Sequence, residues 1–100
     1  MYLAIVDFTT SPADRPAAVA QLEAELGTVR AMPGCLGFRV FPSPETDTDV
    51  TILHEWEDAA SFQAYTESDA FATSGAVLRP MMTTAPCSRR FRAELVESVA

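Results

Sequence analysis

Residues 50–65, VTILHEWEDAASFQAY, contain a change of hydrophobic period, and this change decides the fold. Over 50–57 the side chains alternate, as in a strand, so one face would carry Val50, Ile52, His54 and Trp56. Asp58 is a favourable first cap for a helix, and Phe62 and Tyr65 follow at helical spacing. We therefore expect a strand that leads directly into a helix, with the large side chains filling the angle between them.

The same two patterns, alternation for strands and helical spacing for helices, predict the elements on either side of this stretch. Residues 2–9, YLAIVDFT, form an expected strand with apolar side chains on both faces. The segment 11–16, SPADRP, is typical of a helix start, and proline and glycine at 33–34 end that helix. The helix after Asp58 should break and restart at Ser68 and Asp69, which resemble a second cap. The remaining expected elements are strands 35–41 and 86–96 and a polar loop at 42–49.

The resulting order of elements is βαββαβ, within a single domain that spans residues 1–100. This is the ferredoxin-like arrangement, an α+β fold in which two helices cover one face of an antiparallel sheet. The other face of the sheet also carries apolar residues, and the chain has no third layer for it. A second copy, packed sheet against sheet, is the simplest cover, so we expect a homodimer.

Composition excludes several classes of function. The net charge is −7, and such a chain is unsuited to neutralising the phosphates of nucleic acids or anionic membranes. No apolar run approaches the ~18 residues of a membrane span. The N-terminus has no basic segment and meets Asp7 early, unlike a signal peptide, so a cytoplasmic location is the expectation.

The two cysteines and Asp7 have structural interpretations. Cys35 and Cys87 should lie on opposite edges of the sheet as reduced thiols, and a chain with one histidine is a poor candidate for a zinc site. No metal is therefore expected. Asp7 shares a strand face with apolar residues, which favours an ion pair. Its possible partners are Arg39, Arg89, Arg90 and Arg92.

Three segments carry a family resemblance: MPGCLGFRVF, ILHEWED and AASFQAYTESDAF. Together they resemble the antibiotic biosynthesis monooxygenase (ABM) family, over nearly the whole chain. The resemblance implies a dimeric α+β barrel with a pocket between helices and sheet in each subunit. Characterised members of that family oxygenate polycyclic phenols, anthrones or quinols with O2, without a metal or organic cofactor.

Other members of the family degrade haem, and this branch can be compared position by position. Its iron-binding histidine follows a D-x-F element on the second helix, and Gly75 stands there in SDAFATSG. This chain also differs from the haem-degrading branch at two further positions, those of Asp7 and Tyr65. Haem is therefore not expected, and O2 is the only expected co-substrate.

Four residues are candidates for the site. His54 would accept a proton, Trp56 would stack on a planar substrate, and Tyr65 and Arg79 would bind substrate oxygens. Each also has a structural interpretation. Trp56 and Tyr65 would be core anchors, His54 a hydrogen-bonded core residue, and Arg79 a partner of its helix C-terminus.

The leading hypothesis is a cofactor-free monooxygenase that acts on a small aromatic polyketide-like, anthrone or quinol substrate. The first alternative is an isomerase or cyclase that uses the same pocket without O2. The second is a dimeric binding protein without catalysis. Anaerobic turnover would favour the first alternative, and saturable binding without product would favour the second.

Overall fold

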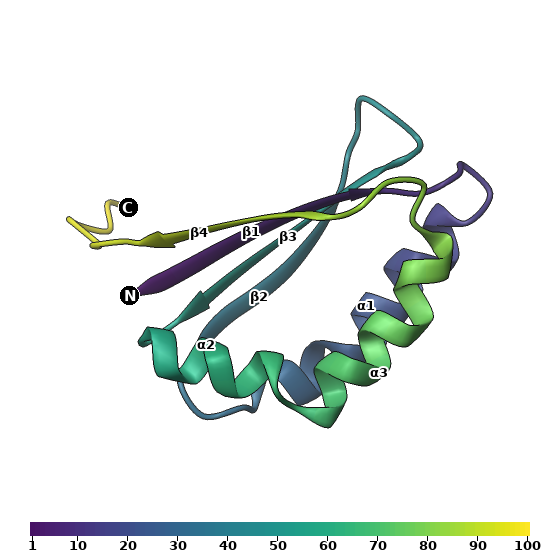
Figure 1. Cartoon of the computed structure of the whole chain (residues 1–100). Coiled ribbons are helices and arrows are strands. Elements are labelled where there is room, and N and C mark those ends of the chain that lie inside the picture. The colour runs from purple at the N-terminus through teal and green to yellow at the C-terminus, as the bar shows by residue number, and fades with distance from the viewer.

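The computed structural model describes residues 1–100 and consists of a four-stranded antiparallel sheet with three helices on one face (Figure 1). The strands follow the order β2-β3-β1-β4, so the α+β, ferredoxin-like expectation is confirmed. None of the helices has the length and apolarity that crossing a membrane requires. The elements are β1 (Tyr2–Thr9), α1 (Arg15–Arg30), β2 (Cys35–Pro42), β3 (Asp49–Trp56), α2 (Ala59–Thr66), α3 (Asp69–Leu78), the 3-10 turn η1 (Arg79–Met81) and β4 (Cys87–Arg92).

The two caps of the second helical segment lie where the sequence places them. The Asp58 carboxylate accepts a hydrogen bond from the Ser61 N–H (2.8 Å) and begins α2. The Ser68 hydroxyl accepts one from the Phe71 N–H (3.2 Å) and begins α3, so the predicted break is confirmed.

The last strand is shorter than predicted, because it ends at Arg92 and not at residue 96. β4 is an edge strand that pairs only with β1, and Arg92 lies opposite Tyr2, the first residue of β1. Two further bonds join Met1 and Ala93: the Ala93 N–H donates to the Met1 carbonyl (2.8 Å), and the N-terminal ammonium donates to the Ala93 carbonyl (2.7 Å). Beyond them the partner strand has ended, and residues 94–100 are exposed without regular structure.

The core lies between the helices and the sheet. As the alternation predicts, Val50, Ile52, His54 and Trp56 of β3 are all buried on the helix side. The rest of the apolar core is Ala4, Phe8, Ala18, Leu22, Val29, Phe38, Phe62, Tyr65 and Leu78.

The opposite face of the sheet has no covering layer in the single chain (Figure 1). Leu53 lies at its centre, paired with Ile5 on β1 and Arg39 on β2. Asp7 also lies on this face, where its carboxylate accepts a hydrogen bond from the Thr51 hydroxyl (2.5 Å). Arg89 approaches it at 3.5 Å, so the predicted ion pair is confirmed with this arginine.

The loop between β2 and β3 is fastened by one side chain from α1. Arg15 Nη1 donates to the backbone carbonyls of Ser43 (3.0 Å), Thr46 (2.6 Å) and Asp49 (3.2 Å). A cationic donor on three carbonyls holds the loop in one conformation, because charge-assisted hydrogen bonds are stronger than neutral ones.

We expect Arg15→Ala to loosen this loop without unfolding the domain. Amide hydrogen exchange should become at least about tenfold faster over residues 43–49, because local opening no longer breaks charge-assisted bonds. Arg92→Ala is the matched control, since the Arg92 side chain makes no hydrogen bond. Equal exchange in the two variants would contradict the role given to Arg15.

Candidate functional site

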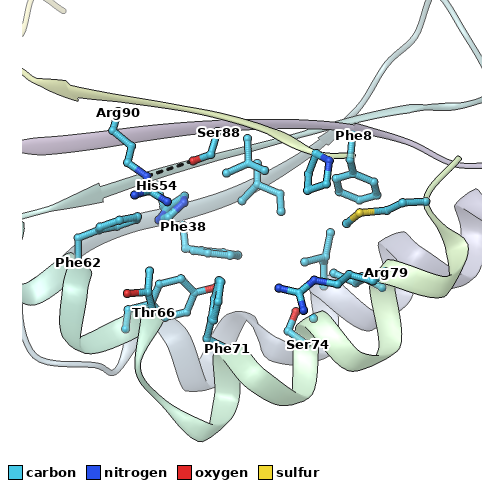
Figure 2. A pocket seen from close by; sticks show the side chains of 18 residues that line it. Phe8, Phe38, His54, Phe62, Thr66, Phe71, Ser74, Arg79, Ser88 and Arg90 are labelled. Atoms are coloured by element: carbon cyan, nitrogen blue, oxygen red, sulfur yellow. Dashed lines mark hydrogen bonds between the residues drawn. The ribbon is translucent and has the colours of Figure 1, made fainter. Parts of the chain in front are cut away.

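A cavity of about 220 Å³ lies between the sheet and helices α2 and α3 (Figure 2). Most of its wall is apolar, which is typical of sites for small organic ligands. Five aromatic rings contribute to this wall: Phe8, Phe38, Phe62, Tyr65 and Phe71. A planar aromatic ligand would therefore meet ring faces and edges on several sides.

His54 lines this cavity from β3 and is held by a single hydrogen bond. Trp56 Nε1–H donates to His54 Nδ1 at 2.8 Å. An indole can only donate, so Nδ1 accepts and the neutral ring carries its proton on Nε2. No fully buried side-chain nitrogen or oxygen lacks a partner. Because Nε2 has none within the protein, it faces the open space of the cavity.

The protonation state of His54 follows from its burial. The residue is 3% exposed, and this burial, helped by the nearby positive charge of Arg90, lowers the pKa of His54 to about 4. The ring is therefore neutral at pH 7. With Nδ1 occupied and Nε2 protonated, the geometry favours hydrogen-bond donation by His54 over the proton-accepting role expected from the sequence.

Trp56 does not reach the cavity, and its expected role as a stacking wall is corrected. Its side chain is 0% exposed. It stacks on Tyr65 with ring centroids 5.2 Å apart and an interplanar angle of 24°. It thus lies one layer behind His54 and Tyr65, as a core anchor that also orients His54.

Tyr65 contributes a phenol to the cavity from α2. Burial is the main reason that its pKa is raised to about 12, with smaller contributions from Glu25 and Cys35. Tyr65 is therefore a neutral phenol that can donate a hydrogen bond.

Two arginines line the cavity, although only Arg79 was expected there. Arg79 follows α3, and Arg90 enters from β4, where its Cζ lies 4.9 Å from the centre of the Phe62 ring. Both residues are exposed, so their guanidinium groups lie at the mouth. Figure 2 shows Arg90 beside His54 on the sheet side and Arg79 beside Ser74 on the helix side.

The polar side chains of the cavity can all donate hydrogen bonds, and none of them is acidic. Hydrogen-bond donors are available from His54, Tyr65, Ser74, Arg79 and Arg90, while no aspartate or glutamate lines the cavity. The chain also has no group of three or more histidine, cysteine or acidic side chains arranged to hold a metal ion. Such a set of donors is suited to an electron-rich or negatively charged oxygen.

Arg90 and Ser74 were missed by reasoning from the sequence. For Arg90 a signal exists, since it lies opposite Ala4 in the register of β4 on β1 and therefore shares the helix-facing side. The sequence interpretation considered it only as a partner of Asp7. Ser74 carries no such signal, because a small polar residue on a helix is usually solvent-exposed.

Solved structures with the same fold are numerous, whereas no curated protein matches the chain in sequence. A candidate antibiotic biosynthesis monooxygenase from Deinococcus radiodurans has a TM-score of 0.90 at 13% identity, over 100% of this chain and 99% of that chain. Another from Nitrosomonas europaea has a TM-score of 0.88 at 15% identity, over 93% and 98%. A conserved protein from Methanosarcina mazei has a TM-score of 0.86 at 18% identity, over 94% of each chain. At these identities the likeness establishes the fold.

The family is established by the sequence itself. The profile of the family described as antibiotic biosynthesis monooxygenase matches residues 1–75, from the start of β1 into α3. This range contains all three segments that carry the resemblance, MPGCLGFRVF, ILHEWED and AASFQAYTESDAF. It also contains most of the cavity wall, including His54, Tyr65 and Ser74. The chain therefore belongs to the antibiotic biosynthesis monooxygenase family.

Proposed function

We propose that the protein is a cofactor-independent monooxygenase that oxidises a small phenol or quinol with O2. The observation that supports this most directly is the aromatic cavity whose polar groups donate hydrogen bonds and whose only charges are two arginines. Family membership supports the same proposal.

The chemistry requires an electron-rich substrate, because triplet O2 reacts slowly with closed-shell molecules. A phenolate can pass one electron to O2, and the radical pair then forms a C–O bond at the para carbon. If that carbon carries hydrogen, breaking the O–O bond leaves one oxygen as a quinone carbonyl. The other oxygen leaves as water with the phenolic and para protons, so the substrate supplies all the electrons.

The cavity supports this reaction by stabilising the phenolate. Arg90 and the Nε2–H of His54 lie on the same side of the cavity, where they would donate to one substrate oxygen (Figure 2). Fixed donors of this kind lower the pKa of a bound phenol, and its proton can pass to solvent at the open mouth. The proposal therefore needs neither a carboxylate base nor a cationic imidazole.

The proposal is tested by oxygen uptake with metal-stripped protein and a panel of phenols and hydroquinones. We expect enzyme-dependent uptake and one labelled oxygen from ¹⁸O2 in the product. Arg90→Gln should lower kcat/KM by at least about tenfold, since it removes a charged donor from the developing anion. Arg92→Gln is the control on the same strand, because Arg92 does not line the cavity. Turnover that continues under argon would contradict the proposal and favour an isomerase or cyclase.

We also propose that the protein is a homodimer formed through the open face of the sheet. Only 15 of 100 residues are buried in the single chain, and Phe41 and Phe91 are 47% and 42% exposed. A second copy would cover the half-buried Leu3, Ile5 and Leu53.

Light scattering should give twice the chain mass of 10.8 kDa at micromolar concentration. Leu53→Arg should shift the mass toward that of one chain, because it places a charge at the centre of the apolar face. Gln63→Arg on the exposed side of α2 is the control. A wild-type mass of one chain would rule out this interface.

A further inference from the structure

The charge of the cavity is opposite to that of the whole protein. The chain has a net charge of −7, yet the cavity is lined by Arg79 and Arg90 and by no acid. The one ion pair of the chain joins Arg89 and Asp7 on the other face of the sheet. Arg79 and Arg90 therefore lie at the mouth of one small apolar cavity without an acidic partner, and Arg90 Nε donates only to the Ser88 hydroxyl (3.4 Å).

Both guanidinium groups are held against the cavity by packing. Arg90 lies over the ring of Phe62, which is a cation–π contact. Arg79 folds back along α3 over Gly75, where a Cβ atom would lie 3.5 Å from the Arg79 Cζ. The guanidinium group thus lies close to the helix backbone at residue 75, beside Ser74 (Figure 2).

The two positive groups lie on different walls, so a single substrate oxygen would not satisfy both. The oxygen that becomes a phenolate takes the donors on the sheet side, Arg90 and His54. A second anionic group is then needed at Arg79 and Ser74 on the helix side. A carboxylate fits best, because its two oxygens match the guanidinium fork and it is ionised before binding.

The volume of the cavity limits the size of the ligand. An apolar cavity of about 150 Å³ accepts one benzene molecule, and sites for drug-sized ligands measure roughly 300–1,000 Å³. The cavity here, at about 220 Å³, falls between these values. It suits one or two fused rings.

We propose that the substrate is a small aromatic hydroxy acid of one or two rings, with its carboxylate at Arg79 and its phenolic oxygen at Arg90 and His54. The orientation rests on the proposed function, whereas the preference for an aromatic carboxylate depends only on the cavity. Arg79 is then a specificity-determining residue that selects acids over neutral phenols.

The test measures binding under argon, so that it does not depend on oxygenation. The probes are a dihydroxynaphthoate and the matching dihydroxynaphthamide, titrated by calorimetry. Wild-type protein should bind the acid at least about tenfold more tightly, and added salt should reduce this preference because it is electrostatic. Arg79→Gln should remove the preference and leave the affinity for the amide almost unchanged. Arg92→Gln should keep the wild-type preference.

Equal affinities for the acid and the amide in wild-type protein would overturn the proposal, as would a preference that survives in Arg79→Gln. Oxygen uptake with the same acid is then measured separately. Selective binding of the acid without uptake would remove the oxygenase function while supporting the ligand class. Uptake with neutral quinols, without any preference for acids, would support the oxygenase function and remove Arg79 as the selector.

Discussion

Trp56→Ala is expected to lower the free energy of unfolding by about 3–5 kcal/mol, the usual cost of removing a large buried aromatic side chain. Trp56 is 0% exposed at the end of β3, and its ring stacks on Tyr65. Truncation leaves a cavity at the point where the strand leads into α2. The free energy of unfolding of a small domain is only about 5–15 kcal/mol, so this loss is a large fraction of its stability. Urea unfolding at pH 7 measures it, with Glu57→Ala as the exposed neighbouring control.

Trp56→Phe separates packing from hydrogen bonding at the same position. Phenylalanine keeps most of the ring but removes the N–H that His54 Nδ1 accepts at 2.8 Å. We expect the free energy of unfolding to fall by a smaller amount, about 1–3 kcal/mol, because His54 Nδ1 is left without a donor. Nitrogen NMR of the imidazole should show that the proton is no longer confined to Nε2. If Trp56→Phe leaves the tautomer unchanged, Trp56 does not orient His54.

Hydrophobic period predicted correctly which side chains of β3 share a face but carried no information on their depth. His54 and Trp56 are two residues apart and lie on the same side of β3, as predicted. Only His54 lines the cavity, because Trp56 lies deeper, under Tyr65. Alternation distinguishes two sides of a sheet, whereas the position of a cavity depends on which helix packs above each residue.

Chemical roles were less predictable than positions, because they depend on contacts that no period encodes. The sequence placed a histidine of ordinary pKa on a buried face, which suggested a proton acceptor. Its role changed because of the bond from Trp56 and the degree of burial. Arg90 entered the site through the pairing of β4 with β1, a contact between residues far apart in the chain.

The burial of His54 also predicts a pH dependence of stability. Its pKa is lowered from 6.5 to about 4 in the folded protein, so between these values the unfolded chain binds a proton that the folded chain does not. Stability therefore rises with pH through this window, and it is lost as the pH falls from 6.5 to about 4. A shift of this size corresponds to about 3 kcal/mol. His54→Asn keeps an acceptor for Trp56 but does not titrate, so it is the matched variant.

Urea unfolding at several pH values should give wild type a steeper decline than His54→Asn, by about 3 kcal/mol over that window. The exposed Asp58 carboxylate, whose pKa is lowered by its bonds to Ser61, affects both proteins alike. Parallel curves would mean that His54 is not buried in its neutral form.

The protonation state of His54 also affects the pH dependence of catalysis. If His54 stays neutral from pH 5 to 8, the acidic limb of the kcat/KM profile must follow the ionisation of the substrate. That limb should then move with the pKa of the phenol across a substrate series and remain in the His54→Asn variant.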